Sequence, residues 1–390
     1  MPNAWNHGRA ATDAAHWRRS SADTRRFEIE GTDTAGPTFG EPGRLTPEEL
    51  QLAMRNHGLP LEALRYPITP PGLHYTLIHY DVPAVDPETW LLEVGGRVER
   101  PLRLTLADLR SRPRERLAVT LECAGNGRAL MDPRALSQPW LHEAVGTAEW
   151  GGTSLWPVLA DAGIDPAADE VVFTGLDRGV ERGVEQAYAR SLSLADARRP
   201  EILLVDEMNG GPLPPQHGAP VRLVVPGWYG MASVKWLSGI EVIGGSFDGF
   251  QQRQQYRLRQ DPREPGEPLD RMLPRALMVP PGIPEFLTRG RFVRRGPHTI
   301  IGRAWSGRAP IALVEVSVDG GASWATARLD PPDLGPLAWR SWSFEWTAEP
   351  GDVVLACRAT DGAGATDAPA WNVGGYANPE PHRVPVTVLD

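Results

Sequence analysis

The sequence predicts an α+β domain followed by an all-β, immunoglobulin-like sandwich. Up to about residue 260, short apolar strands and short helices follow one another in irregular order, which argues against a doubly wound sheet. No Gly-x-Gly-x-x-Gly segment opens a helix, so a dinucleotide-binding fold has no support. Later segments are short, alternating and separated by turns, as in sandwiches of roughly a hundred residues. We expect an extended N-terminal arm over residues 1–42, the α+β domain over residues 43–260 and the sandwich over residues 261–390.

The elements of the α+β domain are expected from helix caps, turn residues and apolar runs. Thr46-Pro47-Glu48-Glu49 starts a helix, with an N-cap, a proline at the first helical position and acids in the first turn. A second helix is expected over residues 151–162 because Gly163 supplies a C-cap. Loops of turn residues are expected at 175–179 and 209–220. Strands are expected at residues 73–80, 90–94, 119–123, 170–174, 202–205 and 221–225, and a helical turn at 104–110.

The composition of the chain changes after about residue 260. Residues 260–284 hold many prolines and charges and are expected to form a linker across a surface. The strands of the sandwich are expected at residues 299–304, 312–318, 339–346, 352–360 and 384–388. Five tryptophans are expected in the core of the sandwich or in an interface, namely Trp305, Trp324, Trp339, Trp342 and Trp346.

Composition limits the function. The chain has 390 residues, 41% of them hydrophobic, and a formal net charge of -9, whereas a nucleic-acid binder normally presents a basic face. No nucleic-acid partner is therefore expected, and an anionic ligand would need a local positive pocket. The two cysteines, Cys123 and Cys357, lie in unrelated contexts, so we expect no disulfide.

No membrane span is expected, because no apolar run approaches the roughly 20 residues that cross a bilayer. The arginine pairs Arg18-Arg19 and Arg25-Arg26 are not followed by an apolar segment, so neither predicts an export signal. The cytoplasm is the expected compartment. The periplasm stays open, since a signal removed ahead of residue 1 would leave no trace.

The first stretch that carries chemistry is Val119-Thr120-Leu121-Glu122-Cys123-Ala124-Gly125-Asn126-Gly127-Arg128. An apolar, β-prone run delivers one cysteine to a turn of small residues, which leaves the space above the sulfur open. The thiolate is the form that binds metals, and the guanidinium of Arg128 would favour it. The alternative is a buried structural cysteine, since free cysteines are among the most buried residues.

The second stretch runs from His217 to Leu237 and combines one histidine, Arg222 and Lys235 with glycines and short apolar runs. Fixed cations beside glycine-rich backbone are what a bound phosphate needs. The alternative is that both cations are ordinary charges at strand ends, in contact with water.

Together these stretches resemble the sulfite oxidase family of molybdopterin-dependent oxidoreductases, in the bacterial form that lacks a haem domain. The resemblance rests on Val119–Arg128 and on Glu207-Met208-Asn209-Gly210, His217-Gly218, Pro220-Val221-Arg222, Val225-Pro226-Gly227 and Val234-Lys235-Trp236-Leu237, in the family's order and spacing. It extends from about residue 66 to residue 388. By this resemblance, Cys123 binds molybdenum, and the pterin cofactor is held by Tyr75, His79, Asp177, His217, Arg222, Ser233, Val234 and Lys235.

Further positions match the family's substrate pocket. Arg128 matches an arginine that faces an oxyanion, Tyr256 a tyrosine beside the molybdenum oxo groups, and Trp140 an aromatic residue of the pocket wall. Two positions depart from the family, because Leu77 and Gly374 stand where animal and plant sulfite oxidases carry arginines. We expect a pocket with less positive charge. Arg253 and Arg257, which flank Tyr256 in the sequence, are the candidates for compensation.

The resemblance implies oxygen-atom transfer, with oxidation of sulfite to sulfate as the leading expectation. No His-Pro-Gly-Gly haem segment is found, so electrons are expected to pass to a separate acceptor. The sandwich is expected to pair two chains into a homodimer. Two alternatives remain: the same cofactor acting on another oxyanion or on an S- or N-oxide, and a non-enzymatic interaction protein with a structural cysteine.

Overall fold

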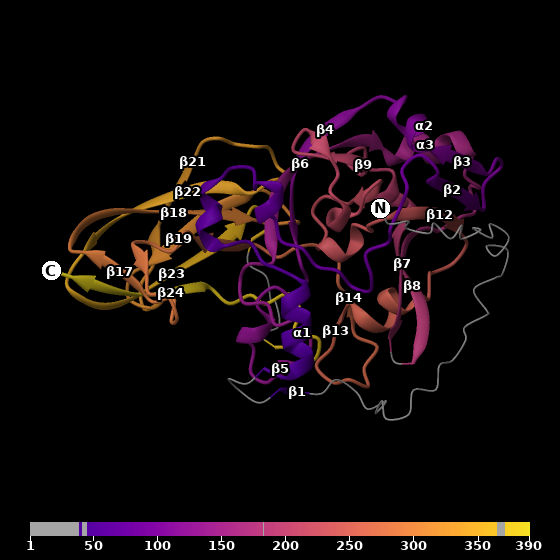
Figure 1. Cartoon of the computed structure of the whole chain (residues 1–390). Helices are drawn as coiled ribbons and strands as arrows, with labels where there is room; N and C mark the ends of the chain where they lie inside the picture. Colours follow the sequence, from indigo (N-terminus) through magenta and orange to yellow (C-terminus); the bar gives the residue numbers. More distant parts are fainter. Residues whose placement is uncertain (1–38, 41–44, 182, 365–370) are drawn as a thin grey trace, which may run out of the picture.

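The computed structural model describes residues 39–40, 45–181, 183–364 and 371–390. The described chain forms two lobes, with the sandwich on one side and an α+β lobe on the other (Figure 1). The predicted fold class is confirmed. The arm expected over residues 1–42 falls almost entirely outside the described residues. No helix in the described part of the chain has the length and apolar character needed to cross a bilayer.

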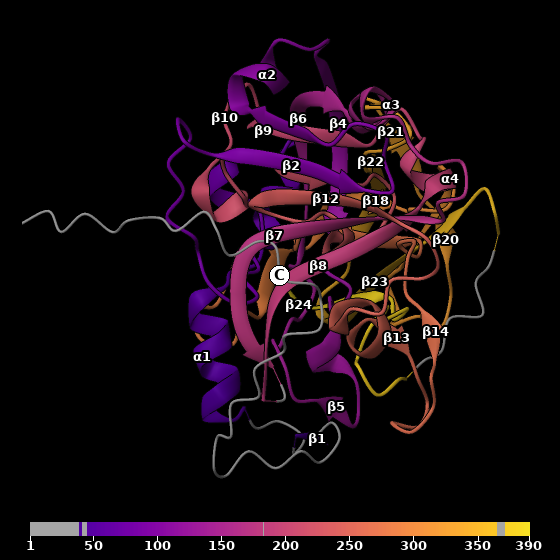
Figure 2. The ribbon, with the colours of Figure 1, turned by 90° about the vertical axis from the view of Figure 1, so that its right-hand side faces the viewer.

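The α+β lobe is built on two five-stranded sheets. One has the order β10-β9-β6-β4, with β11 also paired to β9, and the other the order β3-β2-β12-β7-β8. Figure 2 shows β2, β12, β7 and β8 side by side. The strands are β2 (Leu91–Gly96), β3 (Leu102–Thr105), β4 (Glu115–Glu122), β6 (Val145–Ser154), β7 (Glu170–Glu181), β8 (Val184–Ser193), β9 (Leu203–Met208), β10 (Gly211–Pro212), β11 (Arg222–Val224) and β12 (Leu237–Ile243).

Short helices and small ribbons complete this lobe. The helices are α1 (Pro47–Arg55), α2 (Leu106–Arg110), α3 (Leu155–Ala162) and α4 (Leu194–Ala197). Single turns are η2 (Leu61–Arg65), η3 (Pro71–Leu73), η4 (Arg128–Leu130), η5 (Pro215–His217), η6 (Gly230–Ala232) and the π-helical η7 (Gln251–Gln255). Two-stranded ribbons join β1 (Phe39–Gly40) to β5 (Arg134–Ala135) and β13 (Arg257–Leu258) to β14 (Glu267–Pro268).

Local sequence signals placed several of these elements correctly. Helix α1 begins with the expected capping box, in which Thr46 and Glu49 exchange side-chain and backbone hydrogen bonds. Helix α3 ends at Gly163, whose φ of 71° lies in the left-handed region. Its start was predicted too early, because β6 continues through Gly152 to Ser154. A Cβ on Gly152 would lie 2.1 Å from the carbonyl oxygen of Leu204, so only glycine allows β9 to approach this closely.

Two predictions in this lobe are wrong. Residues 73–80 form no strand: η3 ends at Leu73 and a single bridge joins His57 to Thr76. Residues 175–179 form no separate loop, because β7 continues to Glu181 with a register shift between Thr174 and Arg178. The shift places Asp177 in an irregular part of the strand.

The sandwich packs a four-stranded sheet, β15-β18-β22-β21, on a six-stranded sheet, β16-β17-β24-β23-β19-β20. Its strands are β15 (Arg275–Met278), β16 (Ile283–Pro284), β17 (Arg291–Arg294), β18 (Gly296–Trp305), β19 (Ile311–Ser317), β20 (Ala325–Thr326), β21 (Arg328–Asp330), β22 (Arg340–Ala348), β23 (Gly351–Asp361) and β24 (His382–Leu389). The linker predicted over residues 260–284 is wrong in part, because Arg275–Met278 is a buried strand paired with β18.

The tryptophans divide between three environments. Trp342 and Trp346 lie in the sandwich core. Trp305 and Trp339 lie in a cluster that joins the two lobes. Trp324 is only half-buried and lies against Arg358, whose Cζ is 4.2 Å from the ring centroid. Four of the five are therefore buried within one chain and are not surface for a second copy.

A buried polar network connects the lobes directly behind Cys123. Glu122, the last residue of β4, is 1% exposed. Its carboxylate accepts hydrogen bonds from Arg275 at 2.8 Å, from the Trp305 indole at 2.9 Å and from Asn126 at 3.0 Å. Arg275 and Trp305 belong to the sandwich, so the strand that leads to Cys123 is anchored in the other lobe.

Candidate active site

Cys123 lies at the end of β4, in a tight turn. Its N–H donates to the carbonyl of Ala144 at 2.9 Å, and its own carbonyl accepts from the N–H of Asn126 at 2.9 Å. Gly127 has a φ of 91°, which only glycine adopts without strain. Burial raises the pKa of the Cys123 thiol, although the nearby Arg128 acts in the opposite direction. A cation or metal at the sulfur would therefore be needed to hold the thiolate.

The C-terminal part of the sandwich closes this turn. The N–H of Ala377 donates to the carbonyl of Ala124 at 2.8 Å, and the Asn378 side chain donates to the carbonyl of Gly127 at 2.8 Å. The Nε of Arg128 donates to the carbonyl of Gly374 at 3.0 Å. Residues about 250 positions apart in the sequence therefore shape the cysteine turn together.

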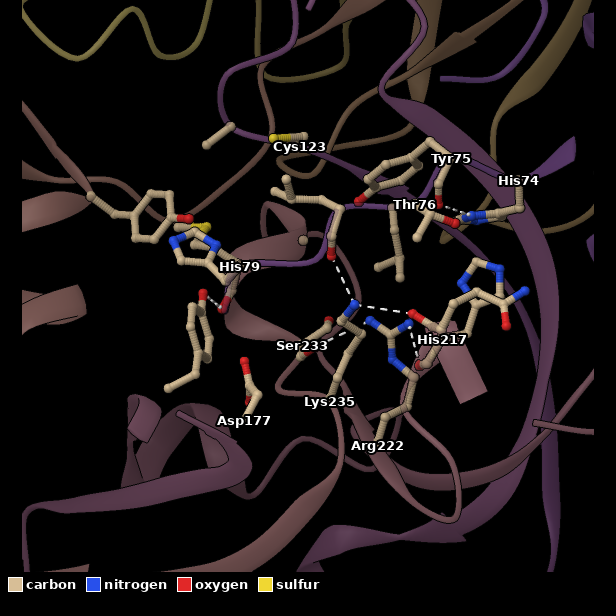
Figure 3. Close-up of a pocket in the computed structure, with 18 residues that line it drawn as sticks. His74, Tyr75, Thr76, His79, Cys123, Asp177, His217, Arg222, Ser233 and Lys235 are labelled. Carbon is tan, nitrogen blue, oxygen red and sulfur yellow. Dashed lines mark hydrogen bonds between the residues drawn. The ribbon is translucent and has the colours of Figure 1, made fainter. Parts of the chain in front are cut away.

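Cys123 borders a pocket whose open space, including its mouth, is about 690 Å³. In Figure 3, Cys123 lies across this pocket from Arg222, and Lys235 lies between them. We call it the cofactor pocket. Of the residues predicted to hold the cofactor, the pocket brings together Tyr75, His79, Asp177, His217, Arg222, Ser233 and Lys235. Val234 does not line it, because its side chain is buried in the core between the sheets.

The two cations at one end of the cofactor pocket are held by backbone carbonyls. Arg222 donates to the carbonyls of His217 at 3.0 Å and Ser233 at 3.1 Å. Lys235 donates to the carbonyls of Leu77 at 2.7 Å and Gln216 at 3.0 Å. Burial lowers the pKa of Lys235 to about 7, and Arg222 adds to this shift. No carboxylate forms an ion pair with either cation among the described residues, so an anionic ligand would relieve their repulsion.

Two histidines and a buried arginine line the same pocket. The Nε of Arg222 is buried without a hydrogen-bond partner, whereas His74 lies against the backbone of Gly146 and His217 against that of Pro71. The two imidazole rings lie 5.3 Å apart, and burial lowers the pKa of His74 to about 4 and that of His217 to about 2. The buried Nε of Arg222 requires a partner, so a polar group fits here. His74 was missed from the sequence, because one more histidine in an irregular segment gives no signal.

Two further predicted residues sit on the other side of the pocket. Burial raises the pKa of Asp177 to about 6, and its carboxylate belongs to the irregular part of β7. Burial lowers the pKa of His79 to about 4, so this ring is neutral at pH 7. The His79 ring lies 5.1 Å from that of Tyr188 and 6.2 Å from that of Tyr256. These groups can hydrogen-bond a heterocycle without adding positive charge.

A second cavity, of about 810 Å³, opens on the other side of Cys123. We call it the substrate cavity. It shares Leu77, His79, Cys123 and Tyr256 with the cofactor pocket. The predicted substrate residues Arg128 and Trp140 line it as well, so the structure brings together all of the side chains assigned to the substrate.

Tyr376 is the substrate-cavity residue that sequence reasoning missed. Its ring lies 5.4 Å from that of Tyr256 and 5.2 Å from the Cζ of Arg128. A Cβ on Gly374 would lie 2.3 Å from the Tyr376 ring, so the aromatic ring occupies the space where a side chain at position 374 would project. Burial raises the pKa of Tyr376 to about 12, which keeps its hydroxyl protonated.

Of the two candidates for compensation, Arg257 lies near Arg128 and Arg253 does not. Arg257 lines a third cavity together with Arg128, Gly374 and Tyr376, but neither candidate lines the cofactor pocket or the substrate cavity. Arg253 is exposed on η7, and Arg257 donates to the carbonyls of Pro265 and Gly266. Arg190 is a nearer cation, with its Cζ 5.5 Å from the Tyr256 ring, but it lies behind that ring and donates to the carbonyl of Gln251.

The donor set around Cys123 limits what metal site it can form. Within the described ranges, no group of three or more histidine, cysteine, aspartate or glutamate residues could hold a metal ion. A metal at Cys123 must therefore take its other ligands from a bound small molecule. The adjoining cationic pocket fits an anionic molecule of this kind, so the site can hold an anionic metal cofactor with Cys123 as its protein ligand.

Comparisons of this sequence with family models and with known proteins identify the family. Residues 79–251 match the family model described as oxidoreductase molybdopterin binding domain, and residues 276–389 match the Mo-co oxidoreductase dimerisation domain. The chain is 35% identical to mitochondrial sulfite oxidase of Homo sapiens over 408 aligned positions, covering 97% of this chain and 74% of that protein. The chain belongs to the sulfite oxidase family of molybdopterin oxidoreductases, and its cofactor is molybdenum-molybdopterin.

Other similar proteins are named for activities other than sulfite oxidation. The crystal structure of the sulfane dehydrogenase SoxCD from Paracoccus pantotrophus superimposes with a TM-score of 0.74 at 25% identity, covering 98% of this chain and 94% of that one. Nitrate reductase [NADH] 1 of Oryza sativa subsp. japonica is 31% identical over 80% of this chain and 37% of its own length. The family is therefore shown, and the substrate requires a separate argument.

Proposed function

We propose that the protein transfers an oxygen atom to the sulfur of a small anion, with oxidation of sulfite to sulfate as the candidate reaction. The observation that carries the proposal is that the sulfur of Cys123 lies where two cavities meet. One cavity offers cations to a cofactor. The other presents Arg128 and Tyr256 to a substrate. The similarity to sulfite oxidases supports the choice of sulfite.

One set of side chains would hold the cofactor, and another would bind the substrate. When bound, the cofactor supplies a molybdenum centre that gives an oxygen atom to the substrate and accepts two electrons. Cys123 would be the only protein ligand to that metal, as a thiolate. Arg222, Lys235 and Ser233 would hold the phosphate end of the cofactor, with His217 and Asp177 on its pterin.

On the substrate side, Arg128 would orient the anion through a charge-assisted hydrogen bond. The hydroxyl of Tyr256 would donate a second hydrogen bond, since burial keeps it protonated by raising its pKa. Trp140 and Tyr376 would exclude water from the cavity. The two electrons would leave to a separate acceptor, and the dimerisation domain would pair two chains.

A second candidate is the same chemistry on another oxyanion or on an S- or N-oxide. Leu77 and Tyr376 favour it, because they give the substrate cavity apolar walls at the positions where the resemblance expected cations. The matches to a sulfane dehydrogenase and a nitrate reductase agree with a family that is not restricted to one substrate.

The experiment is a comparison of two cysteine variants. Cys123→Ser exchanges a soft thiolate for a mostly protonated hydroxyl, so sulfite oxidation should fall by orders of magnitude while the circular dichroism spectrum is kept. Cys357→Ser is the matched control, because Cys357 is also fully buried but donates only to the carbonyl of Ala276 in the sandwich. Full turnover by a metal-loaded Cys123→Ser enzyme would refute the assignment.

A further inference from the structure

Part of the wall of the substrate cavity is apolar. Leu52, Leu77, Ile78 and Val180 contribute aliphatic surface, and Trp140 and Tyr376 contribute aromatic rings. Val180 is 44% exposed, so the apolar wall continues to the mouth of the cavity. The open space of about 810 Å³ includes the mouth of the cavity, so a group larger than an oxyanion can extend toward it. The cavity therefore has room and apolar surface for an organic group.

Arg128 is the one arginine in the described lining of this cavity, and an adjoining cavity that shares Arg128 also holds Arg257 and Arg259. Arg128 is 5% exposed, and it already donates through Nε to the carbonyl of Gly374 and through Nη1 to the carbonyl of Gln138, each at 3.0 Å. Its Nη2 donates to no described residue and is the donor that remains for a ligand. The guanidinium packs so closely that a Cβ on Gly125 would lie 2.4 Å from Nη2. It is fixed in place.

A carboxylate lies in the same lining. Glu181 accepts hydrogen bonds from the hydroxyl of Tyr80 at 3.0 Å and from the side-chain amide of Gln251 at 3.1 Å. Arg128 is therefore the charged donor that this lining presents to an anion, and it matches a single negative charge.

Leu77 places the apolar wall next to the reacting position. It lines both the cofactor pocket and the substrate cavity, as do Cys123 and Tyr256. Its carbonyl is fixed by the hydrogen bond from Lys235, so its backbone position is defined by the cofactor pocket. Leu77 therefore lies where the two cavities join.

From these observations we infer that the preferred substrate is an organic sulfinate, R–SO2⁻. This inference rests on the proposed function and specifies its substrate class. A sulfinate carries a lone pair on sulfur, a single negative charge and an organic group. The sulfinate oxygens accept from Nη2 of Arg128 and from the hydroxyl of Tyr256, and the organic group packs on Leu77 and Val180.

The reaction balances as R–SO2⁻ + H2O → R–SO3⁻ + 2 H⁺ + 2 e⁻. One sulfur–oxygen bond forms, the two O–H bonds of water break, and sulfur is oxidised by two electrons. These electrons reduce two equivalents of a one-electron acceptor, which is ferricyanide in the experiment. Sulfite undergoes the same change but has no group for the apolar wall, so it is the poorer substrate.

The test compares sulfite, methanesulfinate and benzenesulfinate with the molybdenum-loaded enzyme and ferricyanide. We expect kcat/KM to rise in that order, by tenfold or more between sulfite and benzenesulfinate. Leu77→Arg should reverse the preference, whereas Leu77→Met, which keeps an apolar side chain, should preserve it. Calorimetry on the unmodified enzyme should show that benzenesulfonate, the product, binds at least tenfold more tightly than sulfate.

The outcomes separate the two proposals. Oxidation of sulfite with a kcat/KM at or above that of both sulfinates overturns this inference and leaves the proposed function standing. Failure of a fully loaded enzyme to oxidise any of the three overturns the proposed function. The calorimetry needs no variant and no turnover, so equal binding of sulfate and benzenesulfonate overturns the sulfinate inference even if Leu77→Arg does not fold.

Discussion

Replacing Glu122 with glutamine probes the network that anchors the cysteine strand. Glu122 and Arg275 are 1% and 5% exposed, and their charged atoms lie 2.8 Å apart. Glu122→Gln keeps the size of the side chain and most of its hydrogen-bonding atoms. It removes the negative charge and leaves the guanidinium of Arg275 buried without a counter-charge.

The magnitude follows from that burial. Removing one partner of a buried ion pair destabilises a protein by about 3–5 kcal/mol, because the remaining charge is desolvated and unmatched. A loss of about 3 kcal/mol would lower the melting midpoint of a unit of 150–250 residues by roughly 6–12 °C. The exposed pair of Arg97 and Asp165 is the control, with side chains 45% and 37% exposed. Asp165→Asn should change stability far less than Glu122→Gln does.

Thermal and urea unfolding of Glu122→Gln and of Asp165→Asn measures the difference in stability between these two variants. The double variant Glu122→Gln with Arg275→Met adds a stricter check, because removing both charges of a buried pair costs less than removing one. The double variant should therefore be more stable than the sum of the separately measured effects of Glu122→Gln and Arg275→Met predicts. The reasoning would be refuted if Glu122→Gln and Asp165→Asn had equal midpoints, or if the two substitutions in the pair were simply additive.

Three further predictions address the cofactor, the pH dependence and the assembly. Arg222→Met should purify with less molybdenum, since a lost charge-assisted contact costs roughly 1.5–3 kcal/mol; occupancy equal to that of Arg97→Met would contradict it. Burial lowers the pKa of His382 from 6.5 to about 3. Between these two pH values only the unfolded chain binds the proton, so the stability of the folded chain falls as the pH falls. His382→Asn should flatten that fall by up to about 1.4 kcal/mol per pH unit, and parallel curves would show that His382 is not responsible. Light scattering should give about twice the chain mass of 42.6 kDa, and a monomer at all concentrations would exclude the homodimer.

Features with a local cause could be predicted from the sequence. Helix α1 follows from its capping box, and β4 from an apolar run ending in small residues. The grouping of Arg222 and Lys235 with Cys123 came from the resemblance to the sulfite oxidase family, because the residues alone left these cations open as ordinary charges at strand ends. In the structure both cations line the pocket that Cys123 borders.

Features that depend on distant parts of the chain could not be predicted. Residues 73–80 have strand-forming side chains, but the carbonyl of Leu77 accepts from Lys235 and the backbone joins no sheet. The strand Arg275–Met278 was obscured by the prolines on either side of it. Tyr376 gave no signal, because its place beside Arg128 depends on contacts between segments about 250 residues apart.

The closure of the Cys123 turn by residues 374–378 also bears on how the protein is made. Ala377 and Asn378 supply hydrogen bonds to the carbonyls of Ala124 and Gly127 that no residue near the turn replaces. During synthesis, β4 and its cysteine emerge long before these partners exist. The turn can take its final shape only after residue 378 has left the ribosome. The cofactor therefore meets a complete turn only after residues 374–378 have been synthesised, and a chain truncated before residue 374 would lack these contacts.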